Sequence, residues 1–380
     1  MKLGILTQRL HVNYGGLLQC FALQTTLHRL GHEAEVLQRW FPKNEDTFKN
    51  RLTNRCKQLA LLVLQRKWYH YTSEAEECII AQHTNNFIEK YIKPRSPKFY
   101  NTVSMKQYVE KNEFEGYVVG SDQVWRPCYS PCIGNYFLDF AKDKQVKRIS
   151  YAASFGVDEN EYSESQLQQF TPLLQQFDAV SVRESSGIKL CEDYFKTNAQ
   201  LVLDPTLLLD RKDYEQLIDN ENEPQSDGNL FCYILDETPV KKDAIRTIEV
   251  KQHMKSFCVM PKRTDKENLR SSSINDFVYP SVTKWLKAFQ DAEMVLTDSF
   301  HGCVFSIIFN KPFWVIGNEG RGLARFHSLL GLFGLENRLL TSSQLADNDW
   351  TQPIDWVKVN EKREAMKTKS VDFLTKALNK

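Results

Sequence analysis

Glu293 to Ile316 read EMVLTDSFHGCVFSIIFNKPFWVI, and this stretch decides the predicted fold. An apolar strand, Met294 to Thr297, runs into a polar turn that ends at Gly302. An apolar helix, Cys303 to Phe309, and a second strand, Phe313 to Ile316, follow. A strand that feeds a helix through a short turn is half of a βαβ unit. In such sheets ligands bind outside the carboxyl ends of the strands, so we expect the turn to lie in a site.

The turn combines an acid–base side chain with a helix N-terminus. His301 is the acid–base residue, and the free backbone N–H groups at Ser299 and Gly302 favour an anion such as phosphate, helped by roughly half a positive charge from the helix. A structural reading stays open beside this one. Asp298 or Ser299 can simply be the N-cap, with His301 as a first-turn residue.

Composition excludes several classes of function. The chain has 380 residues, which suggests two or three domains, and 49 Lys and Arg balance 48 Asp and Glu. That balance leaves no global field for nucleic acid, so an anionic ligand must be bound locally. The nine cysteines show neither a disulfide framework nor zinc-ligand spacing, and we expect no metal and no cofactor. No signal peptide opens the chain and the longest apolar run, residues 59–64, is far below the roughly 20 residues of a membrane span, so we expect a soluble cytoplasmic protein.

The first residues predict another strand and helix. Leu3 to Thr7 form a strand, Gln8 to Gly16 a turn, and Leu17 to Leu30 a helix. Gly15 and Gly16 let a ligand or another backbone approach closely, while Asn13 and Tyr14 supply polar and aromatic contacts. A tight turn without a ligand is the alternative. The turn is not GxGxxG, which argues against a dinucleotide.

Polar residues also follow the later predicted strands. Residues 116–120 end in Ser121 and Asp122, residues 179–182 deliver Arg183, and residues 201–203 deliver Asp204. This recurrence is typical of a doubly wound sheet whose edge loops form a cleft. Arg183 can grip a phosphate or carboxylate by two parallel bonds, or it can pair with Glu184 or Asp204.

The chain divides into two α/β halves. We predict an N-terminal Rossmann-like domain over residues 1–210, a C-terminal one over 229–350 and a terminal helix over 351–380, with the two domains facing each other across a cleft. Residues 43–113 read as a basic helical insertion, in which 59–71 pack one face on the core or else contact a membrane surface or a partner. In the second half, cations follow two predicted strands: Lys262, Arg263, Arg321 and Arg325.

Six motifs, in this order, resemble the polysaccharide pyruvyl transferase family. They are NYGGLLQCFALQ (residues 13–24), VVGSDQVW (118–125), SYAASFG (150–156), SVRE (181–184), LDPTLLL (203–209) and LTDSFHGCVFSIIFNKPF (296–313). The resemblance implies a GT-B-like fold of two Rossmann-like domains. It also implies transfer of the enolpyruvyl unit of phosphoenolpyruvate to a sugar of a surface polysaccharide or its lipid-linked precursor, giving a pyruvate ketal.

The resemblance carries over to single residues. Relatives can read Arg-Leu-His where this chain has Ser299-Phe300-His301, so the histidine is retained and the arginine is not. His301 is then the general acid–base, because histidine ionises near neutrality. Arg183 and the four later cations are the candidates for holding the donor. Asp122 and Asp298 orient sugar hydroxyls or cap helices, and Asn13 and Tyr14 face the acceptor.

Two other functions stay open on the sequence. One is a GT-B glycosyltransferase that uses a nucleotide sugar, and the other is a non-catalytic sugar-binding protein of polysaccharide assembly. The acceptor sugar, the oligomeric state and contact with the inner face of a membrane are not determined by any motif. The pyruvyl-transfer hypothesis requires an accessible imidazole with an arginine or lysine head beside it.

Overall fold

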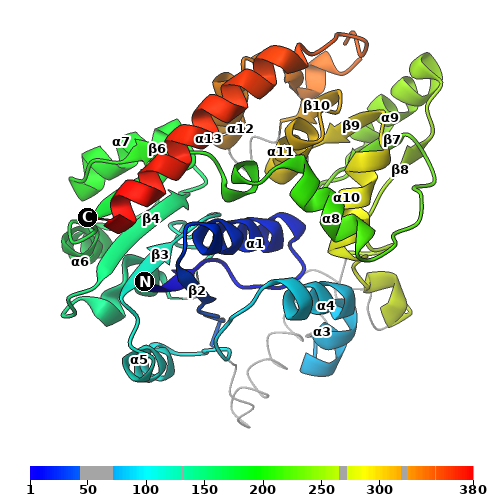
Figure 1. Ribbon diagram of the computed structural model, residues 1–380. Helices are drawn as coiled ribbons and strands as arrows, with labels where there is room; N and C mark the ends of the chain where they lie inside the picture. The colour runs from blue at the N-terminus through cyan, green and yellow to red at the C-terminus, as the bar shows by residue number, and fades with distance from the viewer. Residues whose placement is uncertain (43–71, 131, 265–271, 318–322, 347, 380) are drawn as a thin grey trace, which may run out of the picture.

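Two parallel sheets organise the protein (Figure 1). The computed structural model describes residues 1–42, 72–130, 132–264, 272–317, 323–346 and 348–379. The first sheet has the order β2-β1-β3-β4-β5-β6 and the second the order β11-β10-β9-β7-β8. The strands are β1 (Lys2–Leu6), β2 (Glu33–Val36), β3 (Gly116–Val119), β4 (Lys147–Ala153), β5 (Ala179–Val182), β6 (Gln200–Leu201), β7 (Leu230–Tyr233), β8 (Ser256–Phe257), β9 (Met294–Thr297), β10 (Phe313–Ile316) and β11 (Leu339–Leu340).

Helices connect successive strands and pack against the sheets, as the predicted α/β class requires (Figure 1). They are α1 (Tyr14–Arg29), α3 (Glu74–Ile80), α4 (Gln82–Tyr91), α5 (Thr102–Lys111), α6 (Glu164–Leu174), α7 (Ser185–Phe195), α8 (Arg211–Asp219), α9 (Pro239–Gln252), α10 (Val282–Asp291), α11 (Phe300–Ile308), α12 (Ala324–Phe333) and α13 (Trp356–Asn379). Among the described residues, no helix combines the length and apolar character needed to cross a bilayer.

Each sheet has one topological switch point. In the first sheet β1 lies between β2 and β3, and in the second β7 lies between β8 and β9. The connections leaving the two central strands therefore diverge, which opens a crevice at the carboxyl ends of the neighbouring strands. The expected ligand positions are the ends of β1 and β3 in one sheet and the ends of β7 and β9 in the other.

The β9–α11–β10 unit matches the predicted strands residue for residue. The helix, however, begins at Phe300, three residues before the predicted start, so His301 lies in its first turn and Ser299 is the N-cap. Every residue of α11 is buried. A helix that is apolar all round is stable only in such a core position.

The start of α1 was also placed too late. Asn13 is the N-cap and its side chain accepts a hydrogen bond from the Gly16 amide at 3.1 Å. Gly15 and Gly16 therefore belong to the first helical turn and not to the preceding loop. Gly31, with φ of 86°, follows the C-cap, as predicted.

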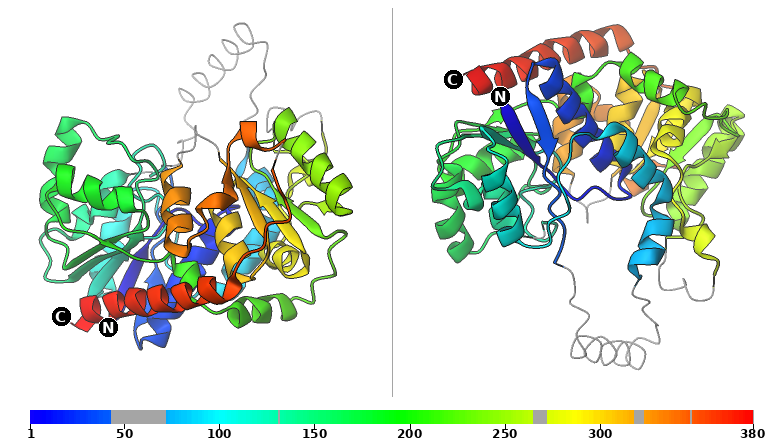
Figure 2. Two further views of the ribbon diagram at one scale, coloured as in Figure 1. Left: turned by 90° about the horizontal axis from the view of Figure 1, so that it is seen from above. Right: turned by 60° about the horizontal axis from the view of Figure 1, so that its bottom comes forward.

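The C-terminal helix returns to the first half of the chain. In Figures 1 and 2, α13 runs from beside α12 to the N-terminus, so the two ends of the chain lie close together. The Leu203 amide donates to Ser370 Oγ at 3.0 Å, and Arg363 Nη2 donates to the Leu209 carbonyl at 2.7 Å. These contacts tie the end of the chain to the segment that carries Asp204. The predicted surface or partner stretch 59–71 lies outside the described residues.

Candidate functional site

Asp204 is the centre of the polar cluster at the carboxyl ends of the first sheet. Its Oδ2 accepts hydrogen bonds from Arg183 Nη1 at 2.8 Å and Ser121 Oγ at 3.2 Å. Its Oδ1 accepts from the Thr206 amide at 3.0 Å and the Thr206 hydroxyl at 2.7 Å. The Asp204 side chain is completely buried. Four donors on one buried carboxylate fix its position firmly.

The second sheet presents His301 to the same carboxylate. His301 Nε2 lies 3.7 Å from Asp204 Oδ2, which is an ion-pair distance and too long for a hydrogen bond. Burial by itself raises the pKa of Asp204, but His301 and Arg183 outweigh burial and hold that pKa well below its usual range. Asp204 is therefore an anion shared by a guanidinium from one half of the chain and an imidazole from the other.

Gly15 covers the imidazole from the first half of the chain. A Cβ at Gly15 would lie 2.1 Å from His301 Nδ1 and 2.2 Å from its Cγ, so only glycine fits against the ring. The His301 side chain is 9% exposed, and its Nε2 has no hydrogen-bond partner. The sequence predicted an accessible imidazole, but the ring is largely buried. The predicted cation, Arg183, does contact the same carboxylate, Asp204.

Two guanidinium groups flank Phe300, the residue after the N-cap Ser299. Arg183 Cζ lies 4.4 Å and Arg325 Cζ 5.9 Å from the centroid of the Phe300 ring. Arg325 lies in the first turn of α12. Burial, and after it the charge of Arg183, lower the pKa of Arg325 to about 10. Two guanidinium groups therefore lie close together at Phe300, with the carboxylates of Asp122 and Glu184 near them.

Arg183 also forms ion pairs with carboxylates, as expected if its role is structural. Besides Asp204, its Nη2 lies 3.4 Å from Asp122 Oδ1. The Arg183 and Asp122 side chains are 1% and 9% exposed. Glu184 is fully buried, and its Oε1 accepts from the backbone amides of Phe155 and Gly156 at 2.8 and 3.2 Å. Arg183 pairs with Asp204, and Glu184 holds the neighbouring loop.

The partners of Asp298 are structural. Its Oδ1 accepts from the Leu235 amide at 2.7 Å, and its Oδ2 accepts from the Asp236 amide at 3.0 Å and Lys241 Nζ at 2.6 Å. Both oxygens are engaged in joining the ends of β7 and β9. The predicted role of Asp298 in orienting sugar hydroxyls would have to share oxygens that already accept these three hydrogen bonds.

The other two residues of the predicted anion turn pack locally. The Ser299 side chain makes no capping hydrogen bond. A Cβ at Gly302 would lie 2.2 Å from Thr297 Oγ1, so this glycine lets α11 approach β9 closely. Ser121, by contrast, is brought to the centre of the cluster, since its hydroxyl donates to Asp204.

Tyr14 does not face an open cleft, contrary to the prediction. It is 1% exposed, its hydroxyl donates to the Pro280 carbonyl at 2.9 Å, and its ring stacks on Trp285 with centroids 5.5 Å apart. Tyr14 thus joins α1 to the segment that carries α10. Asn13 is exposed but is used as the cap of α1, and a Cβ on Gly16 would lie 3.1 Å from the Asn13 amide nitrogen.

Lys262 and Arg263 belong to a different part of the surface. They line a cavity of about 800 Å³ at the carboxyl ends of β7 and β8. Lys262 is 84% exposed and pairs with Asp276 at 3.6 Å, and Arg263 Nη1 donates to Ser272 Oγ at 2.7 Å. The structure does not bring either to His301. Arg321 lies outside the described residues.

The sequence reading underestimated two residues. Asp204 was considered only as a partner for Arg183, and Gly15 only as room for a ligand. Asp204 directly follows a predicted strand and precedes a proline. Ser121 and Arg183 also directly follow predicted strands, and this shared position is the signal that could have pointed to Asp204. No local signal indicated that Gly15 would lie against His301, because 286 positions separate the two in the chain.

Comparisons with known proteins agree with the fold and with the motifs. The chain is 23% identical over 276 residues to general stress protein 30 of Bacillus subtilis (strain 168), with 68% of this chain and 76% of that protein covered. Among solved structures, Arabidopsis thaliana UGT89C1 complexed with UDP is 10% identical, with 98% of both chains covered and a TM-score of 0.51. Anabaena Alr3699/HepE in complex with UDP and glucose is 12% identical, with 99% and 96% covered and a TM-score of 0.51.

The structural likeness concerns the fold alone and confirms the GT-B-like arrangement of two Rossmann-like domains. The family model for polysaccharide pyruvyl transferase matches residues 13–320, which include all six motifs. The chain therefore belongs to the polysaccharide pyruvyl transferase family.

Proposed function

We propose that the protein transfers the enolpyruvyl group of phosphoenolpyruvate to a sugar of a surface polysaccharide or its lipid-linked precursor, forming a pyruvate ketal. The observation that carries this proposal is the convergence of His301 and Arg183 on Asp204 from the two sheets, with Nε2 and Nη1 at 3.7 and 2.8 Å from one carboxylate oxygen. An acid–base ring and a fixed cation are the two parts that this donor requires, and membership of the family supports the substrate class.

His301 is the proposed general acid–base. Its proton goes to the methylene carbon of the donor, which becomes a methyl group while positive charge develops at the central carbon. A first sugar hydroxyl attacks that carbon and gives its proton back to the ring. The carbon–oxygen bond to phosphate then breaks. A second sugar hydroxyl closes the ketal and gives its proton to the departing phosphate, while the ring keeps the proton from the first hydroxyl. One donor and two hydroxyl groups thus give one ketal and one phosphate.

Arg325 and Arg183 are the proposed phosphate and carboxylate contacts. Their Cζ atoms lie 5.9 and 4.4 Å from the centroid of the Phe300 ring. Phe300 is the residue next to Ser299, and Ser299 is the position where relatives can carry arginine. Burial and the neighbouring Arg183 lower the pKa of Arg325 to about 10, so a bound anion would favour its charged form. An anionic donor would therefore gain more from this pair of groups than from one exposed arginine.

Access to the ring requires Gly15 and His301 to separate, because the ring is 9% exposed and Gly15 contacts it directly. The two residues come from different sheets, so an opening of the halves would uncover the ring, and closure over the substrates would exclude water.

The direct test is phosphate release from phosphoenolpyruvate in the presence of a panel of sugar acceptors. His301→Gln should lower turnover by about 10²-fold or more, since that is the usual contribution of a general acid–base. Arg325→Gln should raise the KM for phosphoenolpyruvate. Unchanged turnover in His301→Gln would remove the ring from the mechanism.

A thermal-shift panel separates the competing functions. Stabilisation by phosphoenolpyruvate and not by nucleotide sugars supports pyruvyl transfer. The reverse result would favour a glycosyltransferase, the alternative that the UDP-bound structures of the same fold suggest. Binding of sugars without any phosphate release would favour a sugar-binding protein of polysaccharide assembly.

A further inference from the structure

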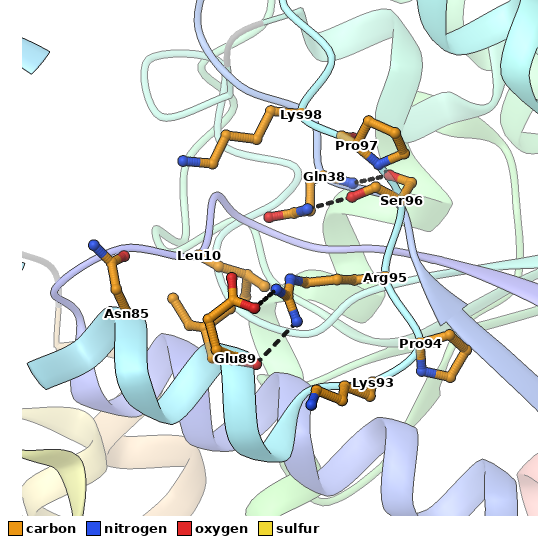
Figure 3. Close-up of a pocket in the computed structure, with 11 residues that line it drawn as sticks. Leu10, Gln38, Asn85, Glu89, Lys93, Pro94, Arg95, Ser96, Pro97 and Lys98 are labelled. Carbon is orange, nitrogen blue, oxygen red and sulfur yellow. Dashed lines mark hydrogen bonds and ion pairs between the residues drawn. The ribbon is translucent and has the colours of Figure 1, made fainter. Parts of the chain in front are cut away.

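An open groove of about 930 Å³ lies between α4 and the segment Lys93 to Lys98 (Figure 3). Leu10 and Ile88 supply its apolar lining, and the amide side chains of Asn85 and Gln38 lie on its sides. This volume is typical of a small-molecule site. The groove contains none of the residues of the Asp204 and His301 cluster.

Two lysines of the groove, Lys93 and Lys98, carry charge that no carboxylate of the described residues neutralises. Arg95 is paired with Glu89, but Lys93 is exposed and makes no ion pair within the described residues. Lys98 Nζ lies 4.0 Å from the centroid of the Trp40 ring, and Arg9 Cζ lies 5.8 Å from the same centroid. Neither of these cations is in an ion pair with a described residue. On a protein with a net charge of +1, such a surplus is a local feature of this surface.

The groove is within reach of the proposed reaction centre. Leu10 and Gly15 belong to the same connection between β1 and the first turn of α1, and Gly15 contacts His301. Five residues span at most about 18 Å, so a chain of a few sugar units that occupies the groove can extend to His301.

We propose that this groove binds an anionic unit of the glycan acceptor, a sugar that carries a carboxylate or a phosphate. The inference rests on the proposed function, because it assigns the acceptor side of the same reaction. Lys93 and Lys98 supply the charge. The Asn85 amide can hydrogen-bond to sugar hydroxyls, and so can Gln38 Oε1, whereas Gln38 Nε2 already donates to the Ser96 carbonyl. A concave surface with amide side chains suits a discrete glycan better than a membrane surface, which is flat on this scale.

The test measures binding to the full-length protein by calorimetry in the absence of phosphoenolpyruvate. The probes are a galacturonate trimer, maltotriose with a terminal phosphate, and neutral maltotriose. We expect the galacturonate trimer, the phosphorylated trimer or both to bind, and the neutral sugar to bind at least tenfold more weakly. The double variant Lys93→Gln, Lys98→Gln should weaken anionic binding about tenfold, because each exposed charge contributes up to about 1 kcal/mol.

The matched control is the double variant Lys251→Gln, Lys369→Gln, which removes the same charge from two exposed lysines of α9 and α13. Four results would each overturn the proposal. Neutral and anionic sugars could bind equally, or the control could weaken binding as much as the groove variant does. Binding could also survive in Lys93→Gln, Lys98→Gln, or the protein could prefer anionic lipid vesicles to the glycans. Thermal stabilisation by phosphoenolpyruvate is measured separately. If the groove binds no anionic glycan, the test of phosphoenolpyruvate as donor still stands, and if phosphoenolpyruvate does not stabilise the protein, the test of the groove still stands.

Discussion

Gly15→Ala is the sharpest test of the contact between the two halves. The added Cβ would lie 2.1 Å from Nδ1, 2.2 Å from Cγ and 2.7 Å from Cβ of His301. Ordinary contacts begin at 3.4 Å, so the ring must retreat by about 1.3 Å or the halves must move apart. Either movement shifts the ring relative to Asp204, which lies 3.7 Å from Nε2. A displacement of about 1 Å in a catalytic group can cost 10²-fold in rate, and we expect turnover to fall by about that factor.

The assay is the kcat for phosphate release, measured with the acceptor that supports the wild-type rate and accompanied by a thermal melt. Gly331→Ala is the control, because this glycine is exposed on α12 and a Cβ there would meet no atom closer than 3.8 Å. That change should leave turnover unaltered and stabilise the helix by up to about 1 kcal/mol. Wild-type turnover in Gly15→Ala would refute the inference that the absence of a side chain at Gly15 lets the halves close with the His301 ring in its working position.

Three further predictions concern stability. Asp204→Asn removes the nearest negative charge from the buried Arg183 and leaves it the longer ion pair with Asp122. This change should lower the free energy of unfolding by about 3 kcal/mol in urea titrations. A loss below about 1 kcal/mol would contradict the role of Asp204 as the hub. The pKa of Asp204 is lower in the folded protein than in the unfolded chain, where it is about 3.9. The ionised carboxylate therefore stabilises the fold above about pH 3.9, and this stabilisation is lost as the pH falls below that value. Between roughly pH 5 and 3 the wild type should lose more stability than Asp204→Asn. Tyr14→Phe removes the hydrogen bond to Pro280 and should lower the free energy of unfolding by about 1 kcal/mol in thermal or urea unfolding. The KM for the acceptor should not change. A changed KM with unchanged stability would restore the acceptor role predicted from the sequence.

The strands and their ends were predictable because they depend on local patterns. β5, β9 and β10 have the predicted bounds, β3 ends one residue before its predicted end, and β1 lies one residue before its predicted range. β6 covers residues 200–201 in place of the predicted 201–203. Four-residue apolar runs that end in polar turns predict buried parallel strands whatever lies around them. The helix starts were less predictable, since α1 and α11 each begin three residues early. Gly15, Gly16 and Gly302 have low helix propensity, but close packing of the backbone stabilises the helical conformation there.

The candidate site was predictable only as a set of positions. The patterns place His301, Arg183, Ser121 and Asp122 at strand ends. The structure brings the first three to Asp204 and brings Asp122 to Arg183. Lys262 and Arg263 also follow a strand, but that strand is β8 at the edge of the second sheet, away from the switch point. Strand order decides which strand ends meet, and order along a sheet is not written in any local pattern.

The amino-acid sequence by itself determined the α/β class, the division into two halves and the family to which six motifs point. Only the tertiary structure decided that Gly15 lies on the His301 ring, that Asp204 is shared between the halves and that Tyr14 is buried against Trp285. The physical reason is the distance along the chain over which each feature is determined. Strand and helix patterns depend on neighbours a few residues apart, whereas these contacts join residues about 100 to 290 positions apart, and packing of the two sheets selects them.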